Sequence, residues 1–386
     1  MRKTGFDQQK YVLLQSQHIR ERIQAFGGKL YLEFGGKLFD DYHASRVVPG
    51  FAPDTKIRML MELRDQAEIL LVINASDIEK NKIRGDLGIP YDMDVLRLID
   101  AFREKGLYVG SVVITRYESQ PAAVSFANHL RDLGVPCYYH YPIPGYPADV
   151  QKIMSSEGCG KNDYVPTTRP LVVVTAPGPG SGKMATCLSQ LYHENLRGVQ
   201  AGYAKFETFP VWNLPLDHPV NLAYEAATTD LDDANIVDPF HLKAYNKIAV
   251  NYNRDVEIFP VLDAMFESIY GESPYKSPTD MGANMIGCCI SDDEAVRYEA
   301  GQEIIRRYYR AMVGQKQGLV APAEVDKMRI LLKQAGLRPE DRPVVAPALR
   351  RGVHSHLRHR IGCGTDRQGQ QQFVGMELGV PISQMR

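Results

Sequence analysis

The sequence predicts an α/β protein built on a doubly wound, mainly parallel sheet, with a helical subdomain after it. Three observations predict this class. Short apolar runs alternate with longer segments that are apolar at helical spacing, a glycine-rich turn joins one strand to a helix, and long helical stretches replace the strands from about residue 216. Strands that alternate with helices form right-handed crossovers, and therefore a parallel sheet that is covered on both faces.

The elements of the first domain, residues 1–215, follow one another from helix to strand. Helices are predicted where apolar residues recur every three or four positions, and strands where the apolar run is continuous. The predicted helices are residues 11–26, 56–67, 93–105 and 121–133. The predicted strands are residues 30–34, 68–73, 108–115, 135–141 and 170–175, with one more inside residues 202–215.

The second domain, residues 216–340, is predicted to be mainly helical, with loops rich in Asn, Asp and Pro. Its predicted helices are residues 218–229, 258–270, 292–312 and 323–335. The remaining residues, 341–386, form an atypical basic tail with no sustained period. Because such a segment buries too little apolar surface to offset its ordering entropy, we predict that it is disordered.

Charge, cysteine usage and hydropathy exclude several functional classes. A net charge of −1 gives no sign of nucleic-acid binding, and no apolar run approaches the roughly 20 residues that a membrane span requires. The six cysteines form no C-x-x-C pair, and the N-terminus lacks the apolar core of a signal peptide. We therefore expect a cytoplasmic protein with neither nucleic-acid nor membrane partners; a homo-oligomer is compatible with the sequence.

The stretch APGPGSGKMAT, residues 176–186, predicts a P-loop-like strand–turn–helix unit. Glycine amides and a lysine at a helix N-terminus favour an anion, so the candidate phosphate-binding residues are Gly178, Gly180, Ser181, Gly182, Lys183 and Thr186. The stretch departs from the nucleotide pattern G-x-x-x-x-G-K-[ST] at two positions. Pro177 stands where the first glycine belongs, and Met184 cannot ligate Mg²⁺. The alternative is a purely structural turn.

Two further basic residues are predicted at the same edge of the sheet. Ligands of doubly wound sheets bind outside the carboxyl ends of the strands. Lys37 follows the strand over residues 30–34 in the sequence FGGKL, and Arg116 follows the strand over residues 108–115. We expect both cations to add charge around a bound phosphate.

Acidic residues provide candidates for catalysis and for a metal. Glu207 follows a predicted strand and is a candidate acid or metal anchor; the alternative is a solvated strand end. A cluster of acids, including Asp230 and Asp232, precedes a helix, where it could hold Mg²⁺ or position a catalytic base, or simply cap the helix. The cluster consists of Asp230, Asp232, Asp233 and Asp238, with His241 next to it.

Several long motifs resemble a bacterial family of uncharacterised proteins that is catalogued as a domain of unknown function. The motifs are YLEFGGK, NASDIEKNKIRGDLGI, TAPGPGSGK, GYAKFETFPVWNLP and SPTDMGANMIG. The resemblance implies a cytoplasmic, multidomain α/β protein and supplies no catalytic residues. Members of that family continue with another α/β section where this chain turns into its basic tail. We therefore expect this chain to be a truncated or frameshifted member.

These observations predict a protein that binds a phosphorylated small molecule or a nucleotide, with Mg²⁺ as an optional cofactor. In an enzyme, a phosphate-handling transferase or kinase-like protein, Lys183, Glu207, Asp230 and Asp232 would carry the chemistry. The alternatives are a non-catalytic sensor or scaffold for such a metabolite and a structural assembly protein.

Overall fold

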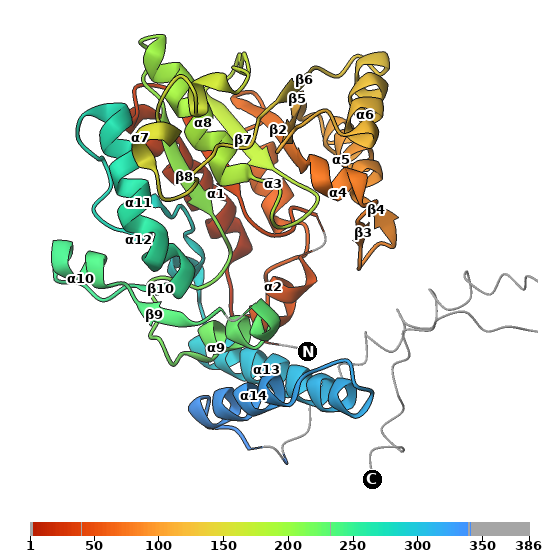
Figure 1. Ribbon diagram of the computed structural model, residues 1–386. Helices are drawn as coiled ribbons and strands as arrows, with labels where there is room; N and C mark the ends of the chain where they lie inside the picture. Colours follow the sequence, from red (N-terminus) through yellow and green to blue (C-terminus); the bar gives the residue numbers. More distant parts are fainter. Residues whose placement is uncertain (1–2, 40, 232, 339, 341–386) are drawn as a thin grey trace, which may run out of the picture. The chain divides into compact units, whose positions relative to one another are not determined.

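Six parallel strands form a central sheet in the computed structural model of the chain (Figure 1). They lie across the sheet in the order β6-β5-β2-β7-β1-β8. The predicted α/β class with a mainly parallel sheet is therefore confirmed. The strands are β1 (Leu30–Phe34), β2 (Ala67–Asn74), β5 (Tyr108–Thr115), β6 (Cys137–Tyr139), β7 (Leu171–Thr175) and β8 (Gly202–Phe206).

The structure describes residues 3–39, 41–231, 233–338 and 340, and these lie in the compact unit Met1–Asp341. The predicted basic tail, residues 341–386, lies outside the described residues. The predicted division near residue 215 stays a prediction. In the described part, no helix is both long enough and apolar enough to cross a membrane.

Each face of the sheet has its own hydrophobic cluster, because side chains alternate along a strand. On β1, Leu32 packs in one cluster and Tyr31 in the other. Helices from both parts of the chain cover these faces. The first face carries α1 (Gln8–Ala25), α3 (Thr55–Met61), α5 (Tyr91–Glu104) and α6 (Pro121–Asp132), and the second carries α7 (Val150–Ile153), α8 (Lys183–Leu196) and α11 (Asn253–Tyr270).

The strand order changes direction between β2 and β7. After β2 the chain moves outward to β5 and β6, whereas after β7 it crosses β1 to reach β8. The helices that follow the two strands, α5 and α8, lie on opposite faces. In a doubly wound sheet the crevice for a ligand opens at the carboxyl ends of the strands at this position.

The later part of the described chain consists mainly of helices, and it also contains a short antiparallel pair of strands that the sequence did not predict. Figure 1 shows α13 beside α14, and α13 also packs against α9 and α2. This pair consists of β9 (Asn235–Val237) and β10 (Val250–Tyr252), and a hairpin pairs β3 (Ile83–Arg84) with β4 (Ile89–Pro90). The other helices are α2 (Tyr42–Val47), α4 (Ala75–Glu79), α9 (Pro219–Glu225), α10 (Pro239–Tyr245), α12 (Pro278–Met281), α13 (Asp293–Lys316), α14 (Pro322–Gln334) and the 3₁₀ turns η1 (Cys159–Lys161), η2 (Thr229–Leu231) and η3 (Ile286–Cys289).

Two element boundaries differ from the predictions. The helix predicted over residues 56–67 ends at Met61, because the chain turns there and Ala67 already pairs with Leu171 in the sheet. The helix predicted from residue 258 begins at Asn253 and continues through Pro260. Proline normally breaks or kinks a helix interior, but α11 continues on both sides of Pro260.

Candidate functional site

A cleft of about 550 Å³ opens at the carboxyl edge of the sheet, where the strand order changes direction. Three loops line most of it: residues 115–116 after β5, residues within 140–146 after β6, and residues 180–185 between β7 and α8. Glu33, on β1, also reaches it. The cleft therefore occupies the position that the fold class predicts for a ligand.

The turn between β7 and α8 depends on glycines at specific positions. Gly180 has φ 74° and Gly182 has φ 92°, a region that favours glycine over residues with a side chain. A Cβ at Gly178 would lie 2.3 Å from the Tyr91 hydroxyl, so this glycine is required by packing against α5. Two of the predicted glycines thus shape the turn, and the third admits a neighbouring side chain.

Side chains at the ends of two neighbouring strands hold the turn by its carbonyl groups. Thr115 Oγ1 donates to the Ser181 carbonyl at 2.6 Å, and Asn74 Nδ2 donates to the Gly180 carbonyl at 3.3 Å. The peptide units Gly180–Ser181 and Ser181–Gly182 are both trans. In a trans peptide unit the N–H group points in the direction opposite to the carbonyl group of the same unit. The N–H groups of Ser181 and Gly182 therefore point away from the strands.

These N–H groups and the neighbouring cations have no partners in the described part of the chain. None of the described residues accepts a hydrogen bond from the N–H of Ser181, Gly182 or Lys183. Lys183 is the first residue of α8, and its half-buried side chain lines the cleft together with exposed Arg116. Neither cation forms an ion pair with a described residue. The predicted turn and Arg116 are thus brought together at one cleft.

The two hydroxyl groups predicted to help bind an anion are placed differently. Ser181 Oγ donates to the Gly178 carbonyl inside the turn, which leaves this hydroxyl engaged by the protein. Thr186 is fully buried and is not among the residues that line the cleft. Its Oγ1 has no hydrogen-bond partner among the described residues. The contribution of these two side chains to binding stays a prediction.

Lys37 pairs with an acidic residue and does not line the cleft. Its Nζ lies 2.5 Å from Asp86 Oδ2, in the loop between β3 and β4, and Lys37 is not among the residues that line the cleft. Gly35, two residues before Lys37, has another function. A Cβ at Gly35 would lie 2.5 Å from Glu207 Cγ, so glycine here lets β1 and β8 end side by side.

Glu207 belongs to a cluster of charged side chains next to the cleft. Lys205 Nζ lies 2.7 Å from both carboxylate oxygens of Asp255, 2.8 Å from the Tyr252 hydroxyl and 3.4 Å from Glu207 Oε1. A cavity of about 50 Å³ lies beside these residues. We call Lys205, Glu207 and Asp255 the lysine–carboxylate cluster.

Burial and charge act in opposite directions on the lysine–carboxylate cluster. Burial raises the pKa of Glu207, Lys205 lowers it, and the result is a pKa above the ordinary value. Burial lowers the pKa of Lys205, but the carboxylates of Glu207 and Asp255 outweigh this effect and raise it. Lys183 is close enough to lower the pKa of Glu207 as well, which links the cluster electrostatically to the turn.

The acids predicted to hold a metal are separated or engaged by basic residues. Asp230 is exposed, and Asp232 lies outside the described residues. Asp233 is buried and paired with Arg254, whose Nε lies 2.6 Å from Asp233 Oδ1. Over the described ranges, no three His, Cys, Asp or Glu side chains form a group suited to a metal ion. The metal assignment stays a prediction.

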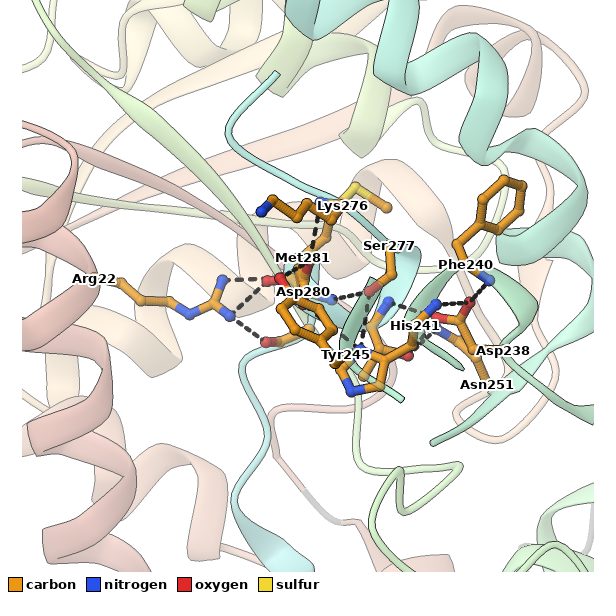
Figure 2. Close-up of polar contacts among 12 residues, drawn as sticks. Arg22, Asp238, Phe240, His241, Tyr245, Asn251, Lys276, Ser277, Asp280 and Met281 are labelled. Atoms are coloured by element: carbon orange, nitrogen blue, oxygen red, sulfur yellow. Dashed lines mark hydrogen bonds and ion pairs between the residues drawn. The ribbon is translucent and has the colours of Figure 1, made fainter. Parts of the chain in front are cut away.

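Asp238 and His241 connect α10 to α12 instead of reaching the cleft. Figure 2 shows Asp238 and His241 beside Ser277 and Asp280. Asp238 Oδ2 accepts a hydrogen bond of 2.6 Å from Thr279 Oγ1, and His241 Nδ1 lies 3.1 Å from Ser277 Oγ. None of these residues lines the cleft. They hold the segment after α11 in place.

The site also contains residues to which the sequence analysis assigned no role. Glu33 accepts a hydrogen bond of 2.6 Å from the Tyr203 hydroxyl and reaches the cleft; an acid inside the apolar run LYLEF was the available signal. Tyr141 and Tyr146 also line the cleft, from the loop after β6. Their signal was the aromatic density of YYHYPIPGY, which begins within β6.

Comparison with known proteins identifies the family. A family model described as "Domain of unknown function DUF1846, N-terminal" matches residues 4–336. The chain is 61% identical over 348 residues to a UPF0371 protein of Streptococcus thermophilus (strain ATCC BAA-491 / LMD-9), an alignment that covers 90% of this chain and 70% of that protein. A UPF0371 protein of Streptococcus pneumoniae (strain JJA) is 60% identical, with the same coverage. The resemblance stated from the motifs is confirmed, and the chain belongs to the DUF1846 family.

Proposed function

We propose that the cleft binds the phosphate group of a phosphorylated small molecule or nucleotide on the turn over residues 180–183. The observation that carries the proposal is the set of unpaired donors at this turn. The N–H groups of Ser181, Gly182 and Lys183 have no acceptor among the described residues, and the Lys183 side chain lies beside them. Backbone donors without acceptors are rare in folded proteins unless water or a ligand pairs with them.

The fold supports this arrangement with fixed charge and fixed geometry. The N–H groups lie at the N-terminal end of α8, where the helix dipole favours an anion. Thr115 and Asn74 hold the carbonyl groups on the other side of the turn, so little reorganisation is needed on binding. Arg116 adds a second cation at the same cleft. A monoanionic or dianionic phosphate is the complementary ligand.

A phosphate-handling enzyme is the second candidate, and Glu207 favours it. A carboxyl group with a raised pKa transfers protons most effectively near neutral pH. Glu207 is not among the residues that line the cleft, but it acts electrostatically on Lys183, which does line it. Turnover of a bound ligand separates an enzyme from a sensor, because a sensor shows saturable binding without product.

A thermal-shift screen tests the binding proposal. The full chain is heated with inorganic phosphate, pyrophosphate, sugar phosphates and nucleotides, each with and without Mg²⁺. A ligand at about 100 times its Kd stabilises the folded state by about 2.7 kcal/mol. We expect at least one of these anions to stabilise the wild type and the Lys183→Ala variant to lose most of the effect.

An exposed lysine far from the cleft provides the matched control. Lys243 lies on α10, so Lys243→Ala removes one positive charge without touching the cleft. It is expected to respond to ligands as the wild type does. The proposal is wrong if no anion stabilises the wild type, or if the Lys183→Ala and Lys243→Ala proteins respond equally.

A further inference from the structure

We propose that the molecule held in this cleft is a nucleoside phosphate, whose base lies against the wall formed by Tyr141, Tyr146 and Met184. This inference rests on the proposed phosphate site and names the rest of the ligand. It comes from the apolar part of the cleft lining, which differs from the turn in its chemistry.

The wall is apolar and continuous with the hydrophobic core. Ile153 and Leu188, which line the cleft, are buried members of the cluster on the α8 face of the sheet, and Ile143 and Met184 pack against that cluster. Tyr141 and Tyr146 complete the wall from the loop after β6. Aromatic and aliphatic groups of this kind bind the flat face of a ring, with aromatic side chains stacking on it.

Two polar side chains that line the cleft beside this wall, Asn162 and His140, are already engaged by the protein. Asn162 Oδ1 accepts from the Tyr141 N–H at 2.8 Å, and Asn162 Nδ2 donates to Ser189 Oγ at 3.0 Å. His140 Nε2 lies 3.1 Å from Gln190 Nε2. Burial lowers the pKa of His140 to about 3, so its ring is neutral. These groups fix the wall and offer few hydrogen bonds to a ligand.

The scarcity of free polar groups at this wall favours a planar base as the group bound there, over a sugar ring or a long polar chain. A polyhydroxylated ring would lose its hydration here without gaining partners, and a buried hydroxyl without a partner is costly. A planar heteroaromatic ring presents weakly hydrated faces to the wall. The Glu33 carboxylate, which also lines the cleft, can accept hydrogen bonds from ribose hydroxyl groups.

The size of the cleft agrees with a ligand of this kind. Small-molecule and cofactor sites have volumes of roughly 300–1,000 Å³. The cleft, at about 550 Å³, falls in this range and is far larger than a phosphate group requires. The wall also explains the residue at position 184, which is Met184 where a Mg²⁺-binding loop would carry a hydroxyl side chain. Met184 contributes apolar surface to the cleft.

Binding of three related probes to the full chain tests the inference. The probes are inorganic phosphate, ribose 5-phosphate and AMP, each titrated calorimetrically. We expect AMP to bind at least about fivefold more tightly than ribose 5-phosphate, because stacking of a base on aromatic side chains contributes a factor of about 5 to 150. Tyr146→Ala should remove that factor and leave the affinity for ribose 5-phosphate unchanged.

Two further variants make the result specific. Met184→Thr should weaken AMP but not ribose 5-phosphate, since it removes apolar surface from the wall. Tyr298→Ala, which removes an exposed tyrosine on α13, should change neither affinity. Equal affinities for AMP and ribose 5-phosphate in the wild type would overturn the inference and leave the phosphate site intact. If none of the three probes binds, the proposed function and this inference both fail.

Discussion

Two polar regions at the carboxyl edge of the sheet differ in how their charges and donors are satisfied. In the lysine–carboxylate cluster, Lys205 is surrounded by Asp255, Glu207 and the Tyr252 hydroxyl. At the turn before α8, the N–H groups over residues 181–183 have no acceptor among the described residues, and Lys183 forms no ion pair with any of them. One region is complete within the protein and the other is not.

The difference separates a structural role from a binding role. Buried charges are tolerated when opposite charges and hydrogen bonds compensate for the lost hydration, which is the state of Lys205. The first N–H groups of a helix have no intrahelical acceptor and are left to water or to a ligand, and the proposed function assigns those of this turn to a ligand. Removal of a charge should therefore affect stability in the first region and ligand binding in the second.

The largest expected effect follows from replacing the mostly buried lysine of the cluster. Lys205→Met leaves Asp255 and Glu207 close together without their counter-charge. Breaking a fully buried pair costs about 3–5 kcal/mol of unfolding free energy, and this is the upper limit here because the Glu207 side chain is 29% exposed. Lys183→Met, the same substitution in the other region, should change the unfolding free energy by no more than about 0.5 kcal/mol. Urea denaturation at pH 7 measures both. Similar costs for the two variants would remove the distinction between the regions.

A smaller effect is expected in the pH dependence of stability. The pKa of Glu207 is raised above its ordinary value of 4.5, so the folded protein holds this proton more tightly than the unfolded chain does. Its contribution to stability is therefore complete below the ordinary pKa and is lost as the pH rises through the raised pKa. Glu207→Gln cannot titrate, so the wild type should lose stability relative to this variant across that interval.

Denaturation of both proteins at a series of pH values measures this difference directly. Other groups that titrate in the same range cancel in the comparison, because both proteins contain them. A difference that stays constant with pH would show that Glu207 titrates as an exposed glutamate does. In that case Glu207 would be more exposed to solvent within the lysine–carboxylate cluster than the distances around Lys205 indicate.

The periodicity of the sequence predicted most of the fold, because that signal is local. The strands over residues 30–34 and 108–115 were predicted with their observed bounds, since both are mainly apolar runs bounded by glycines or polar turns. The end of α3 was missed because Ala67 suits both a helix and a strand. Only its pairing with Leu171, more than a hundred residues away, decides between them.

The candidate site was less predictable, because its parts meet only in the folded chain. The two Gly-Lys turns, at Lys37 and Lys183, have the same local signal at the ends of parallel strands. Asp86 pairs with the first lysine and no described acid pairs with the second. Asp233 is similar, since two short strands and a helix separate it along the chain from its partner Arg254. Local sequence identifies groups able to bind an anion or a metal, but not which of them the protein itself neutralises.

The smallest expected effect distinguishes these two turns. Lys37 and Asp86 are 46% and 37% exposed, and exposed ion pairs contribute about 0–1 kcal/mol. Lys37→Ala should therefore lower stability only slightly, and less at high salt, which screens the pair. It should leave the stabilisation by a phosphate ligand unchanged, because Asp86 holds Lys37 and the side chain does not line the cleft. Thermal shifts with and without ligand, at low and high salt, measure both quantities.

A loss of ligand response as large as that of Lys183→Ala would mean that Lys37 leaves Asp86 for the ligand. The difference between the turn at Lys37, whose lysine is paired, and the turn at Lys183, whose lysine is not, would then hold only for the protein without ligand. The sequence-based assignment of Lys37 to the phosphate would be correct.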